Sequence, residues 1–188
     1  MADERVLREG LAPAFRGHPC GGQLWREAES GAAFAARVAR AAGEDPSLAS
    51  LAALGRDVAK LSWPSWAFER ALLPDEDRRF LEGHVVESVR LLERAAGRGE
   101  EEAVLRAVGQ HHERWDGRGY PQGLRGEEAT RLGRIVAVCD ALAAMTEGRP
   151  WAPRRTLREA CDEVRRRAGS QFDPAVRDWL DDALPEGR

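Results

Sequence analysis

Residues 111–121 read His-His-Glu-Arg-Trp-Asp-Gly-Arg-Gly-Tyr-Pro, and this stretch says most about the fold and chemistry of the chain. Adjacent histidines, a glutamate and an aspartate precede a glycine-tyrosine-proline turn. Neutral imidazoles and carboxylates are ligands that divalent metals take in proteins. Two histidines at a helix end, followed by a loop with two glycines, therefore predict a metal site that a bound group can approach closely. For a histidine pair on its own, a polar helix end and a surface loop would be the better interpretation, so the rest of the sequence decides.

Composition narrows the class of protein. The 188 residues suffice for one domain with its own core. A formal net charge of −3 offers no basic field for DNA and no polybasic patch for a membrane surface. No apolar run reaches the length of a membrane span. The charged residues 1–10 lack the apolar core of a signal peptide, so a cytoplasmic location is expected.

The basic residues are strongly biased toward arginine. Among 29 lysines and arginines, Lys60 is the one lysine. A GC-rich genome accounts for this preference, and a drift that strong should also have converted an unconstrained lysine. Because an ammonium is not interchangeable with a guanidinium, we interpret Lys60 as required by the chemistry of a site.

Apolar residues recur at helical spacing through most of the chain, which predicts an all-α fold. Residues 1–28 are expected to form an irregular N-terminal segment, because glycines and prolines interrupt residues 13–22. Residues 29–184 are then expected to form a single helical domain. Helices are predicted over residues 27–42, 47–61, 74–94, 100–112, 132–145, 156–168 and 173–184.

Polar residues interrupt the apolar faces of four predicted helices. Burying a lone carboxylate is costly unless a charge or a metal pairs with it. Each position has an ordinary explanation, such as an ion pair with an arginine or a satisfied core histidine. Together they favour a metal cluster between helices. The residues are Arg56, Asp57, Lys60, His84, His111, His112 and Asp140.

In this order, the motifs resemble the HD-GYP family, a branch of the HD-domain metal-dependent phosphohydrolases. Residues 111–121 are similar to the HHExxDGxGYP motif of that family. Asp57 and Lys60 match its HDxGK segment, and His84 matches the single histidine that follows. Asp140 matches an aspartate in an apolar helix, and residues 149–151 and 169–174 resemble two further family segments.

The resemblance implies an HD-domain helical bundle with the C-terminal helices of HD-GYP proteins, a di- or trimetal centre of iron or manganese, and hydrolysis of cyclic di-GMP. By matched position, it implies the metal ligands Asp57, His84, His111, His112 and Asp140. It also implies catalytic roles for Asp57 and Lys60. Arginines that hold phosphate and rings that stack on guanine are expected near the loop. These candidates for binding the cyclic dinucleotide are Arg118, Tyr120, Pro121, Arg149 and Trp115.

The departures from the family pattern fall on the metal site. Arg56 stands where the family has the histidine of its HD pair, and a guanidinium cannot ligate a metal. Phe34 and Ser30 stand where members with three metals often carry a histidine and an acid. One ion or none is therefore expected, rather than two or three. With Arg56 facing Asp57 and Asp140, a site closed by an ion pair is the alternative.

Three hypotheses remain open from the sequence. The favoured one is a degenerate HD-GYP domain that binds a cyclic dinucleotide, or a partner, with weak or no hydrolysis. The second is an active cyclic di-GMP phosphodiesterase in which Arg56 substitutes electrostatically for a ligand. The third is a scaffold that contacts a signalling protein through the glycine-tyrosine-proline loop, and the retained ligand set and Lys60 argue against it.

Overall fold

The computed structural model describes residues 4–68, 75–96, 102–148 and 152–187. Over these residues it is helical, with no β-strand beyond two isolated bridges, which confirms the predicted all-α fold. None of the described helices is both long enough and apolar enough to cross a bilayer. The α-helices are α1 (Glu4–Arg16), α2 (Gly21–Ala42), α3 (Pro46–Gly55), α4 (Asp75–Glu82), α5 (His84–Ala96), α6 (Glu102–Gln110), α7 (Arg131–Glu147), α8 (Leu157–Arg166) and α9 (Val176–Ala183).

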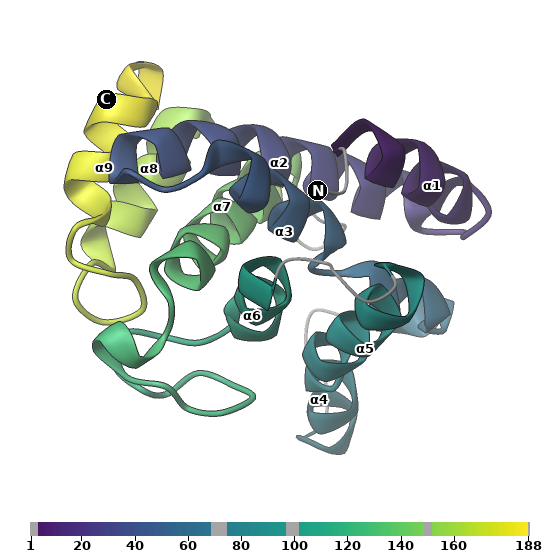
Figure 1. Ribbon diagram of the computed structural model, residues 1–188. Helices are drawn as coiled ribbons and strands as arrows, with labels where there is room; N and C mark the ends of the chain where they lie inside the picture. Colours follow the sequence, from purple (N-terminus) through teal and green to yellow (C-terminus); the bar gives the residue numbers. More distant parts are fainter. Residues whose placement is uncertain (1–3, 69–74, 97–101, 149–151, 188) are drawn as a thin grey trace.

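Helix α2 crosses over α7 at the centre of the bundle and also packs along α3 (Figure 1). Its buried face consists mainly of small side chains, which let the neighbouring helices approach closely. Helix α7 buries a broad apolar face that includes Ile135, Val138 and Leu142. Helices α8 and α9 lie at one end of the bundle, while α4 and α5 lie toward the other (Figure 1). Helices α3, α6 and α7 also pack against one another.

The N-terminal segment differs from the irregular segment predicted over residues 1–28. Helix α1 covers Glu4–Arg16 with Pro13 inside it, and α2 begins at Gly21. The reason is tertiary packing: Phe15 is fully buried, and its ring centroid lies 5.2 Å from that of Trp25 in α2. Burial of Phe15 against the partly buried Trp25 favours a helix that the local sequence disfavours. The domain boundary at residue 29 stays a prediction.

Two predicted helices are interrupted in the structure. The helix predicted over residues 74–94 is divided at Gly83 into α4 and α5, so that His84 is the first residue of α5. The helix predicted over residues 47–61 ends as an α-helix at Gly55 and continues, after a turn, as the 3₁₀ helix η1 (Val58–Ser62). The turn carries Arg56 and Asp57 into the interior. Thr156 and Glu159 form the predicted capping box at the start of α8.

Candidate metal centre

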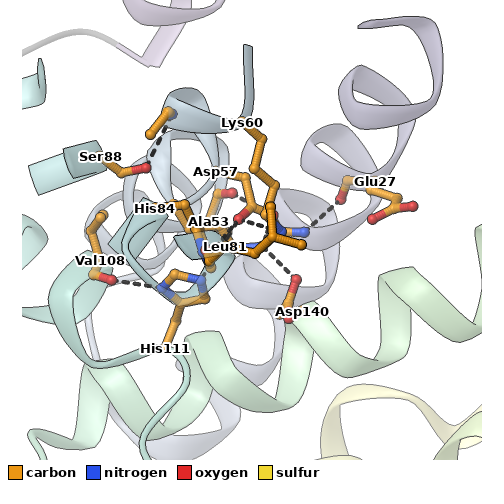
Figure 2. Close-up of polar contacts among 12 residues, drawn as sticks. Glu27, Ala53, Asp57, Lys60, Leu81, His84, Ser88, Val108, His111 and Asp140 are labelled. Atoms are coloured by element: carbon orange, nitrogen blue, oxygen red, sulfur yellow. Dashed lines mark hydrogen bonds and ion pairs between the residues drawn. The ribbon is translucent and has the colours of Figure 1, made fainter. Parts of the chain in front are cut away.

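Asp57 is the centre of a buried polar cluster between α3, α5 and α6 (Figure 2). Its Oδ1 atom lies 2.7 Å from Nζ of Lys60, 3.2 Å from Nε2 of His84 and 3.8 Å from Nε2 of His111. The ammonium of Lys60 is close enough for an ion pair, although it is not aligned for a hydrogen bond to this oxygen. The short 3₁₀ helix after the turn explains this pairing, because it brings Lys60 back beside Asp57.

The two buried histidines are oriented by backbone carbonyls. Nδ1 of His84 lies 2.6 Å from the carbonyl oxygen of Leu81, and Nδ1 of His111 lies 2.6 Å from that of Val108 (Figure 2). A carbonyl oxygen can only accept, so each Nδ1 carries the hydrogen. In a neutral ring, Nε2 then holds a lone pair, and both Nε2 atoms point toward Asp57. Hydrogen bonds of this kind, from the ring nitrogen that does not face the metal, orient histidine ligands in metal sites.

Neither Nε2 atom has a hydrogen-bond partner, although both are buried. Acceptors buried against a carboxylate without a donor are costly, and a cation placed between them removes that cost. One ligand atom from each of Asp57, His84, His111 and His112 lies within 4.8 Å of the others. Imidazole and carboxylate donors suit iron, manganese and zinc. These four residues therefore fit a divalent metal ion.

The protonation states also suit a metal site. Burial lowers the pKa of His84, and the nearby Lys60 ammonium lowers it further. Burial likewise holds the pKa of His112 well below its usual range. Burial alone would raise the pKa of Asp57, but the charges of Lys60 and Arg56 keep it well below its ordinary value. His84 and His112 are thus neutral imidazoles and Asp57 is an ionised carboxylate, which are the forms that bind metals.

Asp140, the fifth predicted ligand, is paired differently. Its Oδ1 accepts a hydrogen bond from Nε of Arg56 at 2.7 Å. The Arg56 side chain is 1% exposed, and its Nε also lies 3.6 Å from Oδ2 of Asp57. Burial would raise the pKa of Asp140, but the guanidinium keeps it below its usual range. The residues around Asp140 do not fit a second metal ion, because a permanent cation already lies against the carboxylate.

A cavity of about 290 Å³ adjoins the cluster and holds two of the predicted dinucleotide-binding residues. Arg118 and Tyr120 line it together with His111, His112 and Asp140. The ring of Tyr120 lies against that of His112, with centroids 4.8 Å apart.

The other predicted dinucleotide-binding residues lie elsewhere. Trp115 lines a separate, water-sized cavity beneath the guanidinium of Arg134, whose Cζ is 5.4 Å from the ring centroid. Pro121 lines a groove between α5 and α6. Arg149 falls outside the described residues.

The loop over the cavity is held by residues that were not predicted as part of the site. The buried Glu113 carboxylate accepts hydrogen bonds from the backbone N–H groups of Gln122, at 2.7 Å, and Leu124, at 3.0 Å. The other side of the loop is tied to the segment before α9, because N–H of Trp115 donates to the carbonyl of Gln171. Glu113 stands beside the histidine pair in the sequence, but its partners are backbone amides, which no residue pattern reveals.

The fold and the cluster define a class: helical domains in which aspartates and histidines from several helices surround a metal position. The family model for the HD domain matches residues 22–176. The chain belongs to this family, and its motifs and the relatives named for cyclic dinucleotide hydrolysis identify it as an HD-GYP member.

Curated relatives support this assignment. The cyclic di-GMP phosphodiesterase of Thermotoga maritima is 34% identical over 125 residues, covering 64% of this chain and 33% of the relative. The cyclic di-GMP phosphodiesterase response regulator RpfG of Xanthomonas campestris pv. campestris is 32% identical over 138 residues, or 73% of this chain and 36% of the relative. The 3'3'-cGAMP-specific phosphodiesterase 1 of Vibrio cholerae is 32% identical over 134 residues, or 68% and 30%. The chain thus spans about a third of the length of these relatives.

Solved structures share the fold. Bd1817, described as an HD-GYP-type protein from Bdellovibrio bacteriovorus, matches with a TM-score of 0.65 at 19% identity, over 96% of this chain and 57% of that chain. The HD domain of the L. monocytogenes phosphodiesterase PgpH, in complex with cyclic-di-AMP, matches with a TM-score of 0.64 at 14% identity, over 93% and 94%. At these identities the similarity shows the fold alone.

Proposed function

We propose that this chain is an HD-GYP signalling domain that holds one divalent metal ion, binds a cyclic dinucleotide and hydrolyses it slowly or not at all. Cyclic di-GMP is the first candidate, because the Thermotoga and Xanthomonas relatives are named as cyclic di-GMP phosphodiesterases. A Vibrio relative is named for 3'3'-cGAMP, which supports the wider class of cyclic dinucleotides.

The observation that carries the proposal is the 2.7 Å hydrogen bond from Nε of Arg56 to Asp140. Two-metal sites clamp both the attacking and the leaving oxygen of a phosphodiester. Here a guanidinium takes the place of a ligand at one position and neutralises the carboxylate that would serve it. Loss of one metal removes several kcal/mol of transition-state stabilisation and lowers turnover by orders of magnitude.

The remaining residues suit binding. A bound iron or manganese ion would act as a Lewis acid toward a phosphate oxygen. Asp57, His84, His111 and His112 would hold that ion, while Lys60 keeps Asp57 ionised. In the adjoining cavity, Arg118 offers a guanidinium to phosphate, and the ring of Tyr120 borders the same space.

The alternative is an active phosphodiesterase, which the intact cluster of one aspartate and three histidines favours. Product analysis after anaerobic incubation with cyclic di-GMP and Mn²⁺ or Fe²⁺ separates the two, and equilibrium dialysis of the labelled nucleotide measures binding. We expect bound, intact cyclic di-GMP. Linear dinucleotide or GMP, abolished by His111→Ala, would establish the alternative. Failure to bind any cyclic dinucleotide would leave a partner protein at the loop as the remaining function.

A further inference from the structure

Gly31 lies in the middle of α2, where glycine weakens a helix relative to alanine. The residues around it on the buried face are small but are not glycine; Ala28, Ala32 and Ala35 are examples. A Cβ atom on residue 31 would lie 2.8 Å from Nη1 of Arg56 and 3.3 Å from its Cζ. Both distances are shorter than an ordinary van der Waals contact. Gly31 therefore provides the space that the Arg56 guanidinium occupies.

The guanidinium has little freedom to move away from such a contact. Its three nitrogens donate to three different acceptors: Nε to Asp140, Nη1 to the carbonyl of Ala53, and Nη2 to the carbonyl of Glu27. The acceptors belong to α7, α3 and α2. A large, fully buried cation is stable here because each of its nitrogens has a hydrogen-bond acceptor, so the surrounding helices are packed to hold it.

We propose that Gly31 and Arg56 form a size-matched pair that builds a permanent cation into the site in place of a second metal ion. The guanidinium supplies positive charge to Asp140 at 2.7 Å and to Asp57 at 3.6 Å. In the metal-free domain Asp140 thereby keeps a counterion, Asp57 has a second one besides Lys60, and a second divalent ion is repelled. The limit of one ion rests on the metal site of the proposed function, whereas the pairing of Gly31 with Arg56 does not.

A double-mutant cycle tests the pairing without nucleotide or metal. Urea unfolding in EDTA is measured for the wild type, Gly31→Ala, Arg56→His and the double variant. Gly31→Ala should raise the unfolding constant about tenfold in the wild type, because it overpacks the site. With the smaller histidine at position 56, the same change should be neutral or stabilising, because alanine favours the helix. Gly22→Ala, whose Cβ meets no heavy atom closer than 3.8 Å, is the matched control in α2. Equal effects of Gly31→Ala in both backgrounds would overturn the pairing.

Two variants test the role of the positive charge. Arg56→Met keeps a long side chain without the charge, and Arg56→Lys keeps the charge without the planar guanidinium and its several N–H donors. In EDTA, the Met variant should unfold at a lower urea concentration than the Lys variant. Adding Mn²⁺ should raise the urea midpoint of the Met variant more than that of the Lys variant. Equal stability of the two would overturn the role of the cation.

Elemental analysis should find one Mn²⁺ per wild-type chain and more than one in Arg56→His. A count of one in both would overturn the limit on metal number, and a count of zero in both would instead contradict the proposed function.

Discussion

The two halves of the site are both largely buried, but they differ in their balance of hydrogen-bond donors and acceptors. Around His84 and His111, buried Nε2 lone pairs face the Asp57 carboxylate, and no hydrogen-bond donor lies between them. Around Arg56 and Asp140, each guanidinium nitrogen meets an acceptor. The first half has the Lys60 ammonium beside Asp57 but no partner for the two Nε2 atoms, so it gains stability from an added cation, whereas in the second half the Arg56 guanidinium already satisfies its acceptors. Asp57 belongs to both halves, since it faces the histidines and also lies 3.6 Å from Arg56.

Removal of Asp57 should have the largest effect, because both halves depend on its charge. Asp57→Ala leaves Lys60 and Arg56 with one fewer buried counterion, and breaking a buried ion pair costs about 3–5 kcal/mol. Urea unfolding should show this loss, and elemental analysis should find no bound metal. Asp178→Ala, on the exposed side of α9, is the control and should change stability by less than about 0.5 kcal/mol. Wild-type metal content in Asp57→Ala would show that the ion binds elsewhere.

The two halves should separate in metal titrations. His111→Ala should weaken Mn²⁺ binding by more than the roughly 10- to 100-fold that is lost when a ligand merely loses its hydrogen-bond partner. Asp140→Asn should lower stability, because Arg56 loses its charged partner, but should leave one ion per chain. Isothermal titration calorimetry on metal-stripped protein measures the Mn²⁺ affinity and the number of ions per chain in both variants, and urea unfolding measures the stability. If Asp140→Asn weakens Mn²⁺ binding as much as His111→Ala does, Asp140 is a ligand after all and the division of the site into two halves is wrong.

The same division marks how far the sequence could predict the molecule. Apolar periodicity predicted the helices around the site, and motif spacing selected the residues that α5 and α6 bring to Asp57. The arginine half depends on two backbone carbonyls, those of Glu27 and Ala53, which no side-chain pattern encodes. The pairing of Arg56 with Asp140 could be predicted from the arginine in the HD position, but these carbonyls could not. A glycine inside an alanine-rich helix was the one sign of the fit, and it indicates a packing constraint without naming the partner.

The boundaries failed where tertiary contacts decide the local structure. Helix α1 forms around Phe15, which is buried beside Trp25, although Pro13 interrupts the local helical pattern. Gly83 divides the helix predicted over residues 74–94, and the break makes His84 the first residue of its own helix. Helix propensity predicts neither the packing of Phe15 on Trp25 nor the break at Gly83, because burial in the folded protein outweighs local propensity.

The acid response of the metal-free domain should show two steps, one for the buried histidines and one for the buried carboxylates. The pKa values of His84 and His112 lie below 6.5 because burial disfavours the charged ring. The unfolded chain then binds more protons, so stability is full above 6.5 and falls as pH drops toward the lowered values. The lowered pKa values of Asp57 and Asp140 give stability that persists above 3.8 and is lost below it. Urea midpoints in EDTA, measured from neutral pH to below 3.8, should show both losses. The first step should shrink in His112→Asn, and an unchanged first step would contradict its assignment to the histidines.

The smallest effect is expected at Glu113, which positions the loop over both halves without belonging to either. Glu113→Gln removes the charge from two hydrogen bonds to the N–H groups of Gln122 and Leu124. Hydrogen bonds to charged groups contribute about 1.5–3 kcal/mol, and because the amide retains one acceptor oxygen, a loss near the lower figure is expected. Amide hydrogen exchange should quicken in residues 117–124, and cyclic di-GMP affinity should fall while Mn²⁺ affinity stays constant. Glu127→Gln, an exposed change just beyond the loop, is the control. A parallel loss of Mn²⁺ affinity would mean that the loop supports the histidine half as well as the nucleotide cavity.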